Sequence, residues 1–173
     1  SILTDLLAKG ELPLRVTHND TKLNNVLLDK KTRKSLCVLD LDTVMPGLAA
    51  YDFGDAIRFG ASTALEDETD LDKVHFSLPY YRAFAEGYLE AFGSRLNEAE
   101  LLSLPMGAKL MTLEVGIRFL GDYLNGDVYF KVDYPEHNLI RARTQLKLLQ
   151  EMEEHWQEMN DVVRELGKGS KKA

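Results

Sequence analysis

The sequence predicts a mostly helical α+β fold that carries one small β-hairpin. Two apolar runs, residues 26–28 and 36–39, flank a polar connection at residues 29–34, which is the pattern of a hairpin. From Pro79 onward, apolar side chains recur at spacings of three and four, which is the period of amphipathic helices. The 173 residues, 45% hydrophobic and 28% charged, suffice for a single domain with its own core.

The first part of the chain is expected to hold strands and short connections. The apolar spacing of residues 2–7 indicates the end of a helix, which stops at Gly10 and Pro13. Both hairpin strands are apolar enough to be buried, and Cys37 would pack there as a small hydrophobe. A turn is expected at Pro46 and Gly47.

The next stretch combines a short helix with an acidic loop. Asp52 or Asp55 is expected to cap a helix that continues through Phe59. Residues 61–73 are rich in Ser, Thr, Asp and Glu but lack the glycine and the spacing of a calcium loop. They therefore predict a solvated acidic face.

The second half of the chain is expected to be helical. The first helix follows Pro79 and ends at Gly93. Asn97 and Glu100 have the spacing of a capping box, which would start a short helix as far as residue 104. Pro105 would then open a separate helix.

The helix expected at residues 105–124 is apolar nearly all round, which is typical of a buried helix. It nevertheless carries Glu114, Arg118 and Asp122 at successive steps of four. Buried charges must be paired, so these side chains either pair with one another or line a polar cleft. If these side chains line a cleft beside the polar loop at residues 18–25, Arg118 becomes a candidate contact for a polar substrate.

The C-terminal part is expected to hold a turn, a short β segment and a long helix. The turn falls at residues 125–127, and the β-like segment at residues 128–132. A single helix is expected at residues 136–166, with a stripe of apolar side chains for the core. Residues 167–173 would form a frayed tail.

One stretch carries a catalytic pattern. His18-x-Asp20 is followed by Asn25, and Asp40 ends an apolar run twenty residues after Asp20. This is the spacing of a kinase catalytic loop and its metal-binding aspartate. Asp20 is the candidate base for the proton of an acceptor hydroxyl, and Asn25 and Asp40 offer oxygen ligands of the kind that Mg²⁺ prefers. The alternative is that these residues are turn formers on either side of a structural hairpin.

Several neighbouring residues are further candidates. Asp42 lies on the same side of an extended backbone as Asp40 and could join the metal site or hold a neighbouring group. Lys22 is a candidate contact for the transferred phosphate or a plain surface lysine. Arg58 could pair with a carboxylate of the site, reach the substrate or form a structural salt bridge. Asp52 begins an Asp-Phe-Gly tripeptide like that of protein kinases, but it comes twelve residues after Asp40 and is expected to be structural.

Composition excludes some classes of function. The net charge of −7 argues against a nucleic-acid surface. No apolar run approaches the length of a membrane-spanning helix, and no secretory leader is visible, so we expect a cytoplasmic protein. The lone Cys37 cannot form an internal disulfide.

With these motifs in view, the chain resembles the C-terminal lobe of the aminoglycoside phosphotransferase and choline kinase family, the small-molecule branch of the kinase-like fold. That family carries His-Gly-Asp-x₄-Asn and then Ile-Asp-aromatic-Glu at a strand end. The corresponding residues here are His18 to Asp20 with Asn25, and residues 39–42. This sequence departs from the pattern at Asn19 and at the last two residues of the second motif.

Within that family, four longer stretches resemble the bacterial N-acetylhexosamine 1-kinases, namely residues 16–27, 38–47, 51–60 and 109–120. This resemblance implies transfer of the ATP γ-phosphate, with Mg²⁺, to the anomeric hydroxyl of N-acetylglucosamine or N-acetylgalactosamine. It also implies positions near the sugar for four residues: Thr43, Arg58, Arg118 and Tyr129. From the residues alone, Tyr129 could equally pack against its neighbours.

Kinases hold ATP between two lobes, and the first lobe carries a glycine-rich loop and a lysine that pairs with phosphate. The sequence before residue 17 supplies neither. We therefore expect residues 1–166 to form the C-terminal catalytic lobe of a longer protein. This lobe alone, without the N-terminal nucleotide lobe, is expected to be inactive.

Two other hypotheses remain at this stage. One is a kinase of the same fold acting on an aminoglycoside, choline or homoserine, where an acidic acceptor pocket would favour a cationic substrate. The other is a kinase-like binding module without catalysis, for which loss of Asp20, Asn25 or Asp40 would be the signature; all three are present.

Overall fold

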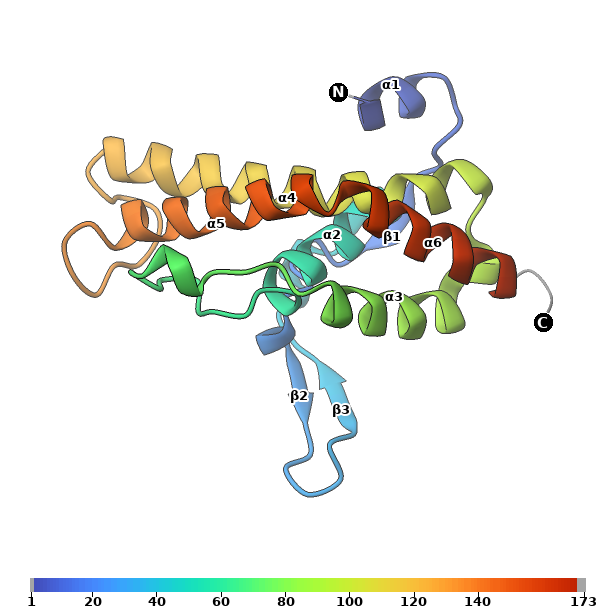
Figure 1. Ribbon diagram of the computed structural model, residues 1–173, viewed down its shortest axis with the longest axis horizontal. Coiled ribbons are helices and arrows are strands. Elements are labelled where there is room, and N and C mark those ends of the chain that lie inside the picture. The colour runs from blue at the N-terminus through green and yellow to red at the C-terminus, as the bar shows by residue number, and fades with distance from the viewer. Residues whose placement is uncertain (1, 171–173) are drawn as a thin grey trace.

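The computed structural model describes residues 2–170. Helices pack together into an elongated body, and one β-hairpin projects from it (Figure 1). In chain order the elements are α1 (Ile2–Ala8), β1 (Arg15–Thr17), η1 (Leu23–Asn25), β2 (Val26–Leu28), β3 (Ser35–Val38), η2 (Leu41–Thr43), β4 (Met45–Gly47), α2 (Ala49–Gly60), η3 (Leu71–Lys73), α3 (Leu78–Phe92), η4 (Gly93–Arg95), α4 (Glu98–Leu124), α5 (His137–Glu154) and α6 (Trp156–Ser170). In the part of the chain that these elements span, no helix is both long and apolar enough to cross a membrane.

The helices α2 and α4 pack backbone against backbone. A Cβ atom at Gly54 would lie 2.3 Å from the carbonyl oxygen of Gly107, and one at Gly107 would lie 2.0 Å from the carbonyl oxygen of Ala50. Only glycine allows such an approach at both positions. This contact fixes the placement of α2, which carries several polar residues of the candidate site.

The main core lies between α2, α3, α4 and α6. The Phe53 ring meets Tyr81 edge-on at 5.9 Å and Tyr88 at 5.2 Å between ring centroids. Phe53 and Tyr81 are completely buried, as is Met159 of α6. The apolar stripes that the sequence predicts for these helices therefore face one another.

The strands form two separate antiparallel pairs. β1 pairs with β4, and β2 pairs with β3 with Val26 opposite Val38. The expectation of buried hairpin strands is wrong, because the β2–β3 hairpin projects away from the helices (Figure 1) and Leu36 is 61% exposed. Cys37 is exposed as well, so it does not pack as a core hydrophobe.

Three predicted helix boundaries are also wrong. Residues 98–124 form one helix, α4, with Pro105 inside it. An interior proline costs roughly 3 kcal/mol, but the predicted capping box at Asn97 is present, and the buried Leu101 and Leu104 keep this part of the helix against the core. The helix expected at residues 136–166 is instead divided at His155 into α5 and α6. The break lets α5 follow α4 while α6 turns onto α3.

The third boundary concerns α2, which begins at Ala49 after Leu48, so Asp52 and Asp55 lie inside the helix and do not cap it.

The β segment expected at residues 128–132 is an irregular loop. At the other end of the chain, α6 continues to Ser170, and a Cβ atom at Gly167 would lie 2.3 Å from a methyl of Leu101. The tail expected at residues 167–173 is thus helical through residue 170, and its last three positions lie outside the described residues.

Candidate active site

The loop after β1 is held in an unusual backbone conformation. Asn19 has φ 62°, in the left-handed region that glycine and asparagine adopt most readily. Its side-chain Oδ1 accepts a hydrogen bond from Thr17 at 3.0 Å, and its Nδ2 donates to the carbonyl of Thr43 at 3.0 Å. The loop therefore accommodates asparagine where the family pattern has glycine.

Asp52 of α2 holds this loop in place through hydrogen bonds to its backbone and to one side chain. Its two carboxylate oxygens accept the backbone N–H groups of His18 and Asn19, both at 2.8 Å. The hydroxyl of Thr21 donates to the Asp52 carbonyl at 2.6 Å. Asp52 thus has the structural role that its position predicts, but through backbone donors of the loop and not as a cap or in an ion pair.

Two more contacts complete the fastening of the loop. The Thr43 hydroxyl donates to the carbonyl of His18 at 2.6 Å, and His18 Nε2 lies 2.9 Å from the carbonyl oxygen of Leu39. Thr43 therefore acts on the loop backbone in this structure, whereas the resemblance implies that it lies near the sugar.

Asp20 lies at the mouth of the site with two defined neighbours. Asn25 Nδ2 donates to Asp20 Oδ2 at 2.7 Å and to the Asp20 carbonyl at 2.8 Å. Lys22 Nζ lies 3.0 Å from the same Oδ2. These contacts orient the carboxylate, and Asn25, which is buried, uses its nitrogen for Asp20 and keeps its amide oxygen for another partner.

Asp40 and Asp42 lie beyond β3 on the exposed side of the loop. Asp40 has φ 60° and precedes the short helix η2, which contains Asp42. Within residues 2–170, no three or more His, Cys, Asp or Glu side chains form a group that could hold a metal by itself. Carboxylate and amide oxygens at Asn25, Asp40 and Asp42 still fit Mg²⁺, because this ion is commonly bound through one or two protein oxygens together with phosphates and water.

A cavity of about 320 Å³ opens beside the catalytic loop. Its walls bring together the catalytic loop, α2, the middle of α4 and the loop after α4. Among the residues proposed from sequence, it is lined by Asp20, Lys22, Arg58 and Arg118. Asn25, Asp40, Asp42, Thr43 and Tyr129 lie outside this lining.

Arg58 is buried at the base of this cavity. Its Nε lies 3.0 Å from Asp55, and its Nη1 lies 2.7 Å from Glu66 and 3.4 Å from the side-chain oxygen of Gln145. Burial alone would lower the pKa of Arg58, but Asp55 and Glu66 raise the pKa above its ordinary value. The guanidinium therefore stays charged, and the salt bridge that the sequence left open is present.

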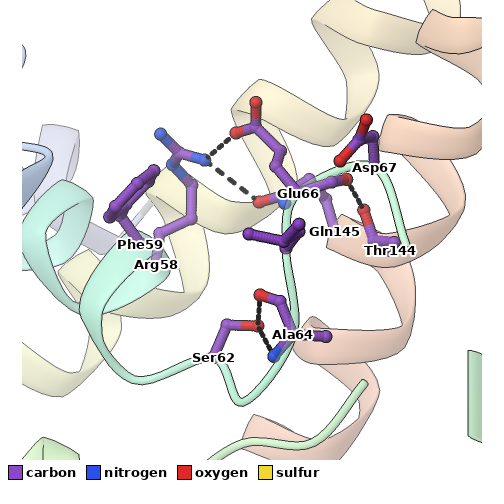
Figure 2. Close-up of a pocket in the computed structure, with 9 residues that line it drawn as sticks. Arg58, Phe59, Ser62, Ala64, Glu66, Asp67, Thr144 and Gln145 are labelled. Atoms are coloured by element: carbon purple, nitrogen blue, oxygen red, sulfur yellow. Dashed lines mark hydrogen bonds and ion pairs between the residues drawn. The ribbon is translucent and has the colours of Figure 1, made fainter. Parts of the chain in front are cut away.

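A second cavity, of about 280 Å³, shares Arg58, Phe59 and Glu66 with the first (Figure 2). The hydroxyl of Thr144 on α5 donates to the carbonyl of Glu66 and holds the loop after α2 against α5. Asp67 is within 3.4 Å of His137. The expectation of a solvated acidic face is therefore wrong for Glu66, because the buried Arg58 holds its carboxylate.

On α4, Arg118 faces an aromatic neighbour from the following loop. It lies 3.6 Å from Glu114, and its Nη2 donates to the Tyr129 hydroxyl at 3.3 Å. Its guanidinium lies 5.4 Å from the centre of the Tyr129 ring and 5.2 Å from that of Phe130. Glu114 and Arg118 thus both pair with each other and line a cleft.

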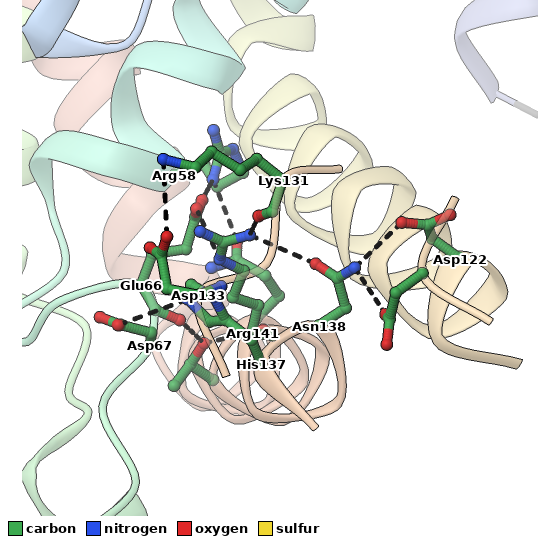
Figure 3. Close-up of polar contacts among 12 residues, drawn as sticks. Arg58, Glu66, Asp67, Asp122, Lys131, Asp133, His137, Asn138 and Arg141 are labelled. Carbon is green, nitrogen blue, oxygen red and sulfur yellow. Dashed lines mark hydrogen bonds and ion pairs between the residues drawn. The ribbon is translucent and has the colours of Figure 1, made fainter. Parts of the chain in front are cut away.

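Asp122, the third charge in this row, is buried and is the residue whose role the sequence did not indicate. Its carboxylate accepts the backbone N–H groups of residues 128, 129 and 130 at 2.9–3.0 Å. Asn138 of α5 donates to it at 2.9 Å (Figure 3). The available signal was a charged residue on an apolar helix just before a turn, which requires a buried partner.

The comparison with known families agrees with this geometry. The model of the phosphotransferase enzyme family matches residues 1–95, which is more than half of the chain. The matched part includes the whole catalytic loop, the hairpin and Asp52, and it ends before α4. The mostly helical architecture with small antiparallel sheets is compatible with the C-terminal lobe of a kinase-like fold. The chain belongs to the phosphotransferase enzyme family.

Proposed function

We propose that this chain is the catalytic lobe of a small-molecule kinase that transfers the γ-phosphate of ATP to the anomeric hydroxyl of an N-acetylhexosamine. The observation that carries this proposal is the Asp20 carboxylate, which Asn25 and Lys22 orient at the edge of a cavity large enough for a sugar. Asp20 takes the proton of the acceptor hydroxyl as that oxygen attacks the γ-phosphorus. The bond between the γ-phosphorus and the oxygen bridging to the β-phosphate breaks, which yields ADP and the sugar 1-phosphate.

Other residues would bind and orient the reactants. Asn25 and Asp40, with Asp42 nearby, are the proposed holders of Mg²⁺, which when bound neutralises charge on the phosphates. Lys22 is the proposed contact for the transferred phosphate, and the 3.0 Å distance between its ammonium and the Asp20 carboxylate supports this role. The nucleotide lobe proposed from the sequence would hold the rest of ATP.

The charge of the cavity bears on the choice of acceptor. Five basic side chains line it, Lys22, Arg58, Arg118, Lys131 and Arg141, against four acidic ones, Asp20, Asp55, Glu66 and Glu114. A polycationic aminoglycoside would be favoured by an acidic pocket, and this lining is not acidic in sum. A neutral sugar that forms hydrogen bonds to arginines and stacks on an aromatic side chain suits it better.

The test is ³¹P NMR on the protein at the full length of its reading frame, with ATP, Mg²⁺ and N-acetylglucosamine. We expect a sugar 1-phosphate signal, and Asp20→Asn should reduce kcat by roughly 10²–10⁴-fold because the base is lost. Asp161→Asn, the same change on the exposed surface of α6, is the matched control and should leave the rate unchanged.

Each outcome has a definite meaning. If Asp20→Asn keeps activity within threefold of the wild type, Asp20 is not the base. ADP formation without an anomeric phosphate would retain the kinase and reject the sugar, and choline, homoserine and aminoglycosides would then be tried as acceptors. If none of these is phosphorylated, the chain is better described as a binding module.

A further inference from the structure

The loop between α4 and α5, residues 125–136, has no regular structure but is held at consecutive backbone groups. Asp122 Oδ1 accepts the N–H of Val128 at 3.0 Å and that of Tyr129 at 2.9 Å, and its Oδ2 accepts the N–H of Phe130 at 2.9 Å. Three successive N–H groups on one carboxylate leave this part of the loop little freedom. Such charge-assisted bonds are among the stronger ones that a loop can make.

Helix α5 adds the second half of the attachment. Asn138, which is fully buried, donates from Nδ2 to Asp122 at 2.9 Å and to Asp127 at 2.8 Å. Arg141 Nη1 donates to the carbonyl of Lys131 at 3.1 Å and lies 3.3 Å from the side-chain oxygen of Asn138 (Figure 3). Residues 128–131 are therefore held by side chains from two helices.

Two of the residues on this segment of backbone line the candidate acceptor cavity. Phe130 and Lys131 line it, and Phe130 also packs on Phe119 with ring centroids 4.7 Å apart. Tyr129 does not line the cavity itself, but its ring and hydroxyl contact Arg118, which does. The position of this wall thus depends on where the backbone of residues 128–131 is fixed.

We propose that Asp122 is a positioning residue for acceptor binding: by accepting the N–H groups of residues 128–130, it sets the cavity wall formed by Phe130 and by Arg118, which Tyr129 contacts. This role presupposes the proposed acceptor site. It predicts that loss of the carboxylate weakens acceptor binding and leaves the chemical step largely intact, because Asp20 and its partners lie on a different loop.

The test variant is Asp122→Asn, which keeps the size of the side chain but turns one acceptor oxygen into a donor. Each Asp122 oxygen accepts two bonds, so the new NH₂ group would oppose two donors: either the N–H of Phe130 and the Nδ2 of Asn138, or the N–H groups of Val128 and Tyr129. The matched control is Asp127→Asn, whose carboxylate accepts from the same Asn138 and can still do so as an amide. Asp127 has φ 57°, a conformation that asparagine tolerates.

The primary measurement is calorimetric titration of the full-length protein with N-acetylglucosamine in the absence of nucleotide, so that a failure of phosphoryl transfer does not affect the result. We expect Asp122→Asn to raise the acceptor Kd about tenfold or more, and Asp127→Asn to leave it within about twofold. In turnover, the acceptor KM should rise about tenfold while kcat and the ATP KM stay within about threefold. Hydrogen exchange should quicken at residues 128–130 and not across α2 and α4.

Two results would overturn the assignment. One is an Asp122→Asn protein that exchanges faster at residues 128–130 yet binds N-acetylglucosamine as the wild type does. The other is a wild-type protein that shows no binding of the sugar. By contrast, sugar binding without phosphoryl transfer would reject the proposed reaction and keep the positioning role of Asp122.

Discussion

Two loops that line the candidate cavity are held in the same way, each by one aspartate on a helix. The catalytic loop gives two consecutive N–H groups to Asp52 of α2, and the loop after α4 gives three to Asp122. The loops lack the backbone hydrogen bonds of regular secondary structure. In each case the carboxylate of one helical aspartate accepts the backbone N–H groups that would otherwise have no partner. Irregular segments with a fixed shape are thereby set on a rigid helical body.

The two loops differ in where their partners come from. The catalytic loop is tied by residues that lie within the part of the chain matched by the family model, including Thr43 and Asp52. The second loop is tied by α4 and α5, which follow the matched part. This separation suggests that changes at the first fastening act on the chemical step, and changes at the second act on the acceptor.

Removal of the first fastening should have the largest effect. Asp52→Ala leaves the N–H groups of His18 and Asn19 without acceptors, at a cost of roughly 1–3 kcal/mol each. Because Asp20 follows directly, we expect kcat to fall on the order of 10²-fold, which is what a displacement of about 1 Å costs a catalytic group. Steady-state kinetics and urea unfolding would measure the two effects.

The acceptor Kd separates this variant from Asp122→Asn. It should change little in Asp52→Ala, because the wall at residues 128–131 is untouched. If Asp52→Ala weakened the acceptor and spared kcat, the two fastenings would not divide chemistry from binding.

The second prediction concerns the helix contact on which both loops depend. In Gly107→Ala the new methyl would meet the Ala50 carbonyl at 2.0 Å, and backbone atoms cannot rotate away as a side chain can. Overpacking of this kind costs about 3 kcal/mol, so the midpoint of chemical denaturation should fall clearly. Gly121→Ala in the same helix is the control, since its added Cβ has no atom within 4 Å apart from the adjoining helix backbone, and it should be neutral or stabilising.

A shift of α2 should also carry Asp52 and Arg58 with it. Folded Gly107→Ala protein should therefore lose kcat, through Asp52 and the catalytic loop, and also acceptor affinity, through Arg58 in the cavity wall. An unchanged denaturation midpoint would mean that the α2–α4 contact is looser than the backbone distances indicate.

The sequence identified the first loop because its information is local and has a fixed spacing. His18, Asp20 and Asn25 stand within eight residues, and Asp40 follows a recognisable apolar run. Helix faces and the capping box at Asn97 were predictable for the same reason, since they repeat or pair within one turn.

The conformation of the second loop was not predicted, because the side chains that hold it do not recur at a regular spacing in the sequence. Residues 128–132 favour a strand by composition, but within residues 2–170 no strand pairs with them, and Asp122 accepts the N–H groups of residues 128–130 instead. The hairpin was predicted correctly and its burial was not, because an apolar strand does not reveal which surface will cover it. Pro105 led to the prediction of a helix boundary that does not exist, because the burial of α4 outweighed the local helix-breaking effect of proline.

The smallest predicted effect is on the pH dependence of stability, which tests whether the negative charge of Asp122 helps to hold the loop after α4. Burial alone would raise the pKa of Asp122, but the N–H groups of Phe130, Tyr129 and Val128 hold that pKa below its ordinary value. A carboxylate with a lowered pKa in the folded state stabilises the protein above its ordinary pKa, and this contribution is lost as the pH falls through the folded-state pKa. Urea unfolding of the wild type and Asp122→Asn should therefore differ most near pH 7, and the difference should narrow as the pH is lowered below about 4. Asp127→Asn should follow the wild type over the same range. The difference in the free energy of unfolding between wild type and Asp122→Asn could instead stay constant down to acidic pH. That result would mean that the amide only fits the site poorly, and that the charge of Asp122 contributes nothing to holding the loop.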